Sequence, residues 1–192
     1  MSNYFLTRGR KNEIKDLVLD ILKACDITAL PVPIAPILKH YGIGCLKMSQ
    51  TVSRSSTEPT NEDGAVLRLQ QRSVIVYNPQ HSRGRIRFTL AVQLAHILLG
   101  HMNGMPQNRA TDMEAAYFAK ELLMPIAVLD HVGARSRQSI ARFCDVSQMA
   151  AGYRARDFER RDRFRNGYGE TEYDIRFLVQ LLEGTVERAS EN

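Results

Sequence analysis

The first part of the chain alternates between helical and strand-like spacing of its hydrophobic residues. From residue 12 to residue 24 apolar side chains recur every three or four positions, which predicts an amphipathic helix. A short helix is predicted within LPVPIAPILKHYGI, where prolines precede it and Gly42 ends it. The residues that follow, IGCLKM, are typical of a strand. The apolar face of the first helix comprises Ile14, Leu17, Val18, Ile21 and Leu22.

Beyond this point the pattern predicts two more strands and then helices only. Residues 49–63 are polar and contain a proline, so they predict a loop. GAVLRLQ and SVIVYN flank a polar turn at Gln71 and Arg72, which predicts a β-hairpin in a small antiparallel-type sheet. Pro125 is expected to close the second of the later helices. These helices are expected at residues 86–100, 112–123, 136–144, 147–160 and 172–188.

The order of these elements predicts an α+β fold followed by a helical tail. We expect one domain over residues 1–130 and the tail over residues 131–192. The last helix has apolar residues on one side, which predicts that it docks on the core or in a dimer. This apolar side carries Tyr173, Phe177, Leu181 and Leu182.

Composition and charge exclude several classes of protein without selecting one. At 192 residues with 44% hydrophobic side chains, the chain has enough apolar residues for a packed core. A net charge of +5 is compatible with nucleic acid but does not require it. Cys25, Cys45 and Cys144 lie far apart, which argues against a disulfide framework and a thiolate zinc site. No apolar run approaches the ~20 residues of a membrane span, and the N-terminus does not resemble a signal peptide. We therefore expect a cytoplasmic protein without a membrane partner.

The stretch RFTLAVQLAHILLGH, residues 87–101, matches part of the sequence motif found on the metal-binding helix of zinc peptidases. Such helices place His at i and i+4, so that both imidazoles lie on one side, and a Glu after the first His serves as general base. His96 stands at the second His position. Val92 stands where the first His is needed and has no metal-binding atom. Gln93 stands where the Glu is needed and cannot act as a base. Glu114, on the next predicted helix, is a candidate third ligand.

Five segments of the chain, in this order, resemble the ImmA/IrrE metallopeptidase family of bacterial and phage proteins. The resemblance implies a zincin-like domain followed by a helix-turn-helix-like segment. It also implies that His96 and Glu114 correspond to the second and third zinc ligands. Val92 occupies the position of the first ligand, and Gln93 that of the catalytic Glu. The segments are LPVPIAPILKHYGI, GAVLRLQQRSVIVYN, RIRFTLAVQLAHILLGH, EAAYFAKELLMP and SIARFCDVSQMAAGYRAR.

The two departures at the motif predict a pseudo-enzyme. Loss of the Glu removes a base that contributes roughly 10²–10⁴-fold to rate. Loss of the His leaves two protein ligands where catalytic zinc usually has three. We therefore expect no cofactor, with weak zinc binding as the alternative. That alternative requires His40, His81 or His101 as a substitute ligand. His101 lies about 140° around a continuous helix from His96, so it does not simply replace the lost ligand.

Two interpretations of the remaining residues stay open. Val92 joins Phe88 and Ala95 in an apolar row, so hydrocarbon can fill the former site. Glu114 is then either paired with His96 or a nearby arginine, or keeps a residual role as a ligand.

The segment SRQSIARFCDVSQMAAGYRAR has the spacing of a helix-turn-helix. Asp145 stands at the turn, where it tolerates left-handed backbone, and Ser147 can cap the next helix. Residues 135–165 hold nine arginines against four acidic residues, which makes phosphate contact conceivable. The alternating signs of RARDFERRDRFR favour instead a salt-bridged face that braces the domain. The candidate nucleic-acid residues are Arg137, Arg154, Arg156 and Arg160.

Three functions are compatible with these features. The first is an inactive, metallopeptidase-like regulatory protein that binds a protein partner. The family resemblance implies that this partner is a helix-turn-helix repressor of a phage or mobile element. The second is a zinc endopeptidase with a substitute ligand. The third is a DNA-binding transcriptional regulator whose affinity falls steeply as salt rises.

Overall fold

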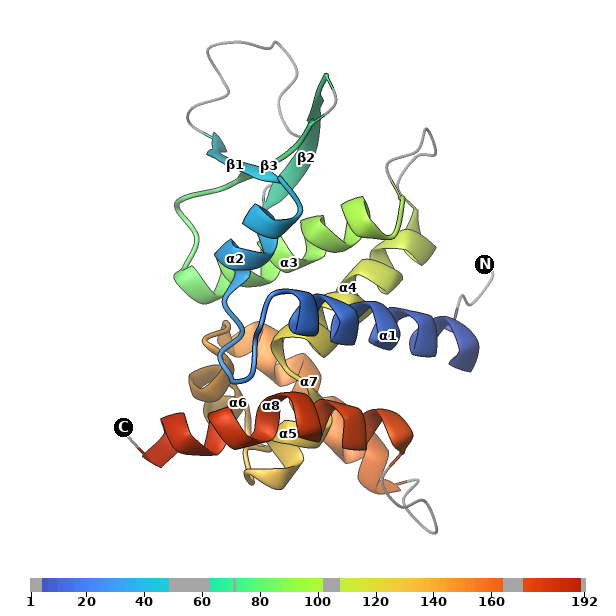
Figure 1. Ribbon diagram of the computed structural model, residues 1–192, viewed down its shortest axis with the longest axis vertical. Coiled ribbons are helices and arrows are strands. Elements are labelled where there is room, and N and C mark those ends of the chain that lie inside the picture. The colour runs from blue at the N-terminus through green and yellow to red at the C-terminus, as the bar shows by residue number, and fades with distance from the viewer. Residues whose placement is uncertain (1–4, 49–62, 71, 102–107, 164–170, 191–192) are drawn as a thin grey trace.

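The computed structural model describes residues 5–48, 63–70, 72–101, 108–163 and 171–190. Within these residues a small sheet lies at one end of the molecule, and helices form the middle and the other end (Figure 1). The predicted α+β class is confirmed. The elements are α1 (Arg8–Ala24), α2 (Ile34–His40), β1 (Gly44–Lys47), β2 (Gly64–Leu69), β3 (Arg72–Tyr77), α3 (Arg83–Leu98), α4 (Arg109–Leu123), α5 (Ile126–His131), α6 (Arg137–Cys144), α7 (Gln148–Arg163) and α8 (Glu172–Ser190).

The sheet has the strand order β1-β3-β2 and contains both kinds of pairing. The predicted hairpin is present, because β2 and β3 pair antiparallel. β1 pairs parallel with β3, which corrects the expectation of an antiparallel-type sheet. The long sequence between β1 and β2 permits this, because a parallel pair needs a crossover connection rather than a tight turn. Gln70, at φ 56°, lies in the turn, and Arg72 already belongs to β3. Most of the predicted loop at 49–63 lies outside the described residues.

The predicted helices are present, and one further short helix, α5, was not expected. Met124 leaves the helical conformation after α4, and Pro125 takes the extended N-cap position of α5. Pro125 therefore both separates α4 from the next helix and begins it, as its fixed φ permits.

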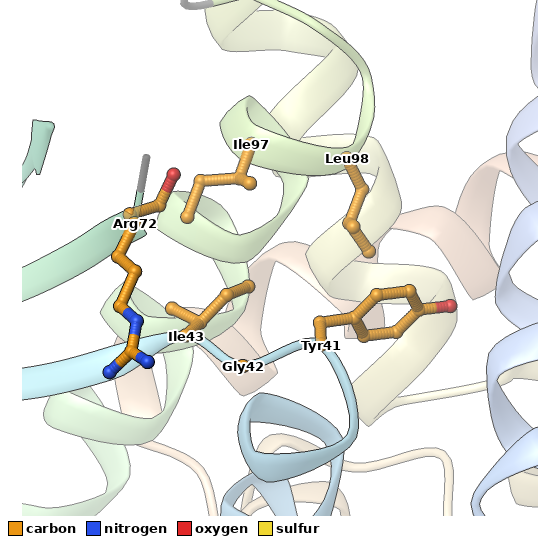
Figure 2. Close-up of a pocket in the computed structure, with 7 residues that line it drawn as sticks. Tyr41, Gly42, Ile43, Arg72, Ile97 and Leu98 are labelled. Atoms are coloured by element: carbon orange, nitrogen blue, oxygen red, sulfur yellow. The ribbon is translucent and has the colours of Figure 1, made fainter. Parts of the chain in front are cut away.

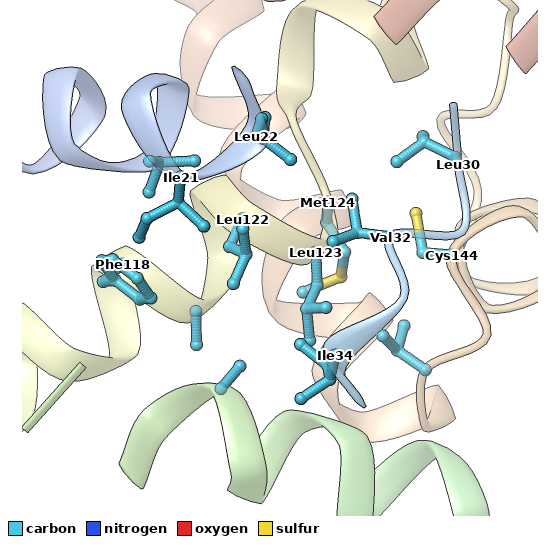
Figure 3. Close-up of a cluster of buried hydrophobic side chains, with 14 of the residues drawn as sticks. Ile21, Leu22, Leu30, Val32, Ile34, Phe118, Leu122, Leu123, Met124 and Cys144 are labelled. Carbon is cyan, nitrogen blue, oxygen red and sulfur yellow. The ribbon is translucent and has the colours of Figure 1, made fainter. Parts of the chain in front are cut away.

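The hydrophobic core lies between α1, α4 and the extended segment that precedes α2. Figure 3 shows Ile21 and Leu22 of α1 near Leu122 of α4. Val32, from the segment before α2, and Cys144 of α6 lie nearby. The same cluster of buried residues includes Phe177 and Leu181 of α8. Side chains from both predicted parts thus share one core, and the division at residue 130 stays a prediction. Among the described helices, none combines the length and the apolar character that a membrane crossing requires.

Two features fix the outer helices against this core. α8 packs against α1 and α5. It approaches the chain at Thr28 so closely that a Cβ on Gly184 would lie 2.8 Å from the Thr28 carbonyl oxygen. Arg87 of α3 donates hydrogen bonds to the carbonyl oxygens of Val32 and Cys144, which ties α3 to the segment before α2 and to α6.

Candidate functional site

The buried end of α3 brings two histidines together. His96 is 2% exposed in the last turn of the helix. The helix ends at Leu98, and Gly100, at φ 74°, turns the chain back. The His101 amide then donates to the His96 carbonyl oxygen over 3.0 Å, and the two Nδ1 atoms lie 3.2 Å apart. The expected separation of 140° is therefore wrong, because it assumed that the helix continues through His101.

Glu114 and Arg10 extend this pair into a four-residue cluster. Nε2 of His101 lies 3.1 Å from Oε2 of Glu114 on α4. Nη2 of Arg10 on α1 donates to the same oxygen over 2.5 Å. We call Arg10, His96, His101 and Glu114 the histidine cluster. It favours the interpretation in which Glu114 pairs with an arginine, although His101 and not His96 is the histidine that contacts it.

The local sequence positions Glu114 and its partner Arg10. Asn108 caps α4, accepting from the amides of Ala110 and Thr111, while the Thr111 hydroxyl accepts from the Asn108 amide. This capping box fixes where α4 begins and hence which residues of its first turns face α3. The Thr7 hydroxyl caps α1 by accepting from the Arg10 amide, which places Arg10 in the first turn of that helix.

Charge is distributed unevenly over the histidine cluster. The hydrogen bond with Glu114 raises the pKa of Arg10, so the guanidinium stays charged. Burial lowers the pKa of His96, the neighbouring His101 lowers it further, and Asp112 opposes both. His96 is therefore neutral at pH 7. The cluster thus contains the charged guanidinium of Arg10, hydrogen-bonded to Glu114, and the neutral imidazole of His96.

Val92 and Gln93, where the resemblance predicts the first ligand and the catalytic Glu, make a packing contact and an amide hydrogen bond. Val92 is half-buried and packs against the core with Phe88, as the apolar row predicted. Gln93 is 3% exposed, and its Nε2 donates to the Gly64 carbonyl oxygen at the start of β2 over 3.3 Å. A Cβ on Gly64 would lie 2.6 Å from the Val76 carbonyl oxygen, so a glycine is required there. Oε1 of Gln93 has no hydrogen-bond partner among the described residues.

These residues do not fit a catalytic zinc ion. Val92 supplies no ligand, and the two ring nitrogens of His101 face different partners, His96 and Glu114. The Arg10 guanidinium already neutralises Glu114, and a divalent cation beside it would be repelled. Within the described part of the chain, no three His, Cys, Asp or Glu side chains are grouped closely enough to hold a metal.

The other two proposed substitute ligands have partners elsewhere. Nδ1 of His81 lies 3.0 Å from Oδ1 of Asp63, before the start of α3. His81 precedes His96 by fifteen residues, most of them in α3, so the two are separated by nearly the whole helix. The ring of His40 packs edge-on against Tyr41, with centroids 4.9 Å apart.

A pocket of about 340 Å³ lies at the C-terminal end of α3, but none of its lining residues belongs to the histidine cluster. Figure 2 shows Ile97 and Leu98 of α3 facing Ile43 and Tyr41 across it. The arginine at its side, Arg72, comes from β3. The pocket is therefore separate from the site that the motif indicated.

The candidate nucleic-acid residues divide into one buried arginine and three exposed ones. Arg154 is 2% exposed and donates to Oε1 of Glu121 over 3.0 Å, so its charge is not available to a phosphate. Arg137, Arg156 and Arg160 are exposed. Arg137 lies across Gly152, where its Nε would be 3.1 Å from an added Cβ.

The turn between α6 and α7 has the features that the sequence indicated. Asp145 adopts a left-handed conformation at φ 50° and ψ 50°. The Ser147 hydroxyl accepts from the Ala150 amide over 3.2 Å.

Sequence reasoning missed Arg10, because an arginine in an amphipathic helix gives no sign that it reaches a carboxylate 104 positions away.

The comparison with known proteins agrees with the resemblance seen in the sequence. A family model described as the IrrE N-terminal-like domain of M78 peptidases matches residues 45–156, more than half of the chain. The matched region contains the departures at Val92 and Gln93 and leaves out Arg10. No curated protein matches the chain. The zincin-like arrangement and the helix-turn-helix interpretation of α6 and α7 stay predictions.

Proposed function

This chain belongs to the IrrE N-terminal-like family of M78 peptidases, and from that premise we propose that it is a catalytically inactive member that acts by binding a protein partner. The observation that carries the proposal is the histidine cluster. An arginine holds the carboxylate that corresponds to a zinc ligand, next to a motif that has lost its first His and its Glu. The partner we propose is a helix-turn-helix repressor of a phage or mobile element, the kind of protein that the family resemblance implies.

The surroundings of the former site support binding without cleavage. Gln93 makes a polar contact to the edge strand β2 through the Gly64 carbonyl oxygen, which joins α3 to the sheet. A glutamine is neutral at every pH of interest and cannot take a proton from a water molecule. The frame can therefore present a surface to a partner while the hydrolytic step lacks both its metal and its base.

The first experiment measures zinc per chain after incubation with excess zinc and desalting. We expect almost none for the wild-type protein. The double variant Val92→His with Gln93→Glu restores the motif but leaves Arg10 on Glu114, so it should bind zinc weakly. Adding Arg10→Met should raise the content to about one zinc per chain, because three ligands are then in place and the competing cation is gone. About one zinc per wild-type chain would instead support the endopeptidase alternative.

A second experiment tests the partner. The wild-type chain is titrated calorimetrically with helix-turn-helix repressors from its own genome, and the mixture is then incubated with zinc and separated by size. We expect one of them to bind and to keep its full length. The triple variant with restored zinc binding serves as the matched control for cleavage. Cleavage of a bound repressor by the wild-type chain would contradict the proposal.

A second candidate function, nucleic-acid binding, is favoured by the outward face of α7. Two of its three carboxylates contact basic side chains: Asp157 lies against Lys120 and Arg154, and Asp162 against Arg135, while Glu159 is exposed. Tyr153, Arg156 and Arg160 lie within about 60° of one another on the exposed surface of the helix, and the Arg156 guanidinium lies 5.0 Å above the Tyr153 ring. Charges of alternating sign in the sequence thus give a surface on α7 that carries mainly arginines, although Arg160 also lies 3.8 Å from Asp157.

Fluorescence anisotropy with a labelled DNA duplex tests this second function. The triple variant Arg137→Gln, Arg156→Gln, Arg160→Gln should lose most of any binding seen at about 50 mM salt. The matched control removes the same charge from exposed positions of α1, with Arg8→Gln, Lys11→Gln and Lys23→Gln. Equal loss in both variants would mean that only net charge matters, and the α7 face would then have no special role.

A further inference from the structure

A row of exposed apolar side chains runs along α8. Ile175 is 50% exposed, Val179 82% and Val186 49%, and Leu182 between them is half-buried. Ile175, Val179 and Val186 are three of the nine large hydrophobic residues that are exposed in the described part of the chain. We call these four residues the α8 row. The helix is docked on the core through Phe177 and Leu181, and Leu182 packs partly against the same core, so the row lies along the border of the docked side.

The spacing of the α8 row is that of the contact positions between two packed helices. Its members are separated by four, three and four residues, the alternation that keeps apolar side chains facing a second helix. Single exposed apolar residues need no explanation, but a row at this spacing marks a surface that another helix covers. The row spans about 17 Å at 1.5 Å per residue, so it is matched by a helix of similar length.

The charges along the border of the row indicate which helix this is. Arg176 and the exposed Glu183 flank the row on one side, seven residues apart, and Arg176 contacts α1 through Asp16. If a second copy of α8 lies antiparallel, with the twofold axis between Gln180 and Leu181, Val179 faces Leu182 of the second copy. The same axis brings Arg176 toward Glu183 of the second copy, and symmetry repeats this opposite-charge pair.

A parallel arrangement lacks this complementarity. The seam geometry would then set Glu183 beside the apolar Leu178 of the second copy and leave Arg176 without an acidic neighbour across the interface. Arg176 also donates to Oδ1 of Asp16 over 2.6 Å, which holds its guanidinium at the border of the row. A guanidinium has five N–H donors, so this bond leaves others for a second carboxylate.

We propose that the α8 row is a self-association surface, through which two copies of this chain form an antiparallel, twofold-symmetric dimer. The interface is small, and interfaces of this size belong to weak, concentration-dependent complexes. The dimer is independent of the histidine cluster, which contributes no residue to the row.

Sedimentation equilibrium of the full chain, from about 5 to about 200 µM, tests the dimer. The mass should rise with concentration from 21.8 kDa toward twice that value. Val179→Lys should weaken the association at least about tenfold, because it places a charge in the middle of the seam. Met149→Lys, the same kind of change at the 67% exposed Met149 of α7, is the matched control and should leave the dimer intact. A monomer at every concentration, or equal weakening by both variants, would overturn the proposal.

Cysteine cross-linking tests the orientation in a background where Cys25 and Cys45 are serine. Val179→Cys and Leu182→Cys are made as separate variants and oxidised alone and mixed. The antiparallel pairing predicts a cross-linked dimer that forms mainly in the mixture, because residue 179 then faces residue 182 of the other copy. Efficient cross-linking of each variant with itself, and none between the two, would overturn the antiparallel arrangement.

Discussion

Two glutamates on the same face of α4 have arginine partners but different surroundings. Glu114 and Glu121 are seven residues apart, about two turns of the helix. Glu121 pairs with Arg154 of α7, and both side chains are almost fully buried at 4% and 3% exposure. Glu114 pairs with Arg10 of α1, whose side chain is 32% exposed, and with the histidine pair. One helix thus carries a buried ion pair at one point and a partly hydrated one two turns away.

The difference separates a structural ion pair from the pair at the site that we propose to be inactive. Burial disfavours the charged form of Arg154, but Glu121 and Asp157 outweigh it and raise its pKa. That pair joins α4 to α7 and involves no imidazole. Glu114 stands at the position for which the family resemblance predicts a metal ligand, and Arg10 supplies positive charge there. We infer that two similar pairs serve different purposes, and each of the following changes tests this inference.

Arg154→Met should have the largest effect. It removes the partner of a buried carboxylate, and such changes cost about 3–5 kcal/mol because the remaining charge is uncompensated. Urea unfolding measures the loss. Adding Glu121→Gln should recover much of it, since the buried charge is then removed as well. A loss below about 1 kcal/mol in the single variant would show that the pair is hydrated and not structural.

Arg10→Met should cost less, about 1–2 kcal/mol, because water can reach Glu114 when the half-exposed arginine is gone. The same unfolding measurement applies, with Arg8→Met on the exposed side of α1 as the control. A cost equal to that of Arg154→Met would remove the distinction between the two pairs.

Acidification should affect the histidine cluster and leave the Arg154 pair unchanged. Burial lowers the pKa of His96 below the ordinary 6.5, so the unfolded chain binds this proton at a higher pH than the folded chain. The free energy of unfolding therefore falls as the pH drops through about 6.5, by up to about 1 kcal/mol between pH 7.5 and 5.5. Chemical unfolding across this range should show the slope in the wild type and a smaller one in His96→Gln. An unchanged slope in the variant would assign the pH dependence to other groups.

The sequence predicted the fold more completely than the site. Periodicity located the helices and the hairpin, because burial of one face leaves a regular mark on the chain. It missed the parallel placement of β1, which depends on a connection rather than on a pattern within the strand. His101 was misplaced because a glycine two residues beyond α3 turns the chain back. Arg10 left no local signal, because its partner is supplied by packing between distant helices.

Arg156→Ala should have the smallest effect and completes the comparison with Arg154, two positions earlier on α7. Their sequence neighbours are alike, yet Arg156 is exposed and lies over the Tyr153 ring, so its loss removes only a surface cation–π contact. We expect a change in unfolding free energy within about 0.5 kcal/mol. Urea unfolding of Arg154→Ala and Arg156→Ala side by side provides the measurement. A loss above about 1 kcal/mol for Arg156→Ala would mean that this face of α7 is covered in solution, because an arginine that contacts only water and one ring cannot contribute so much.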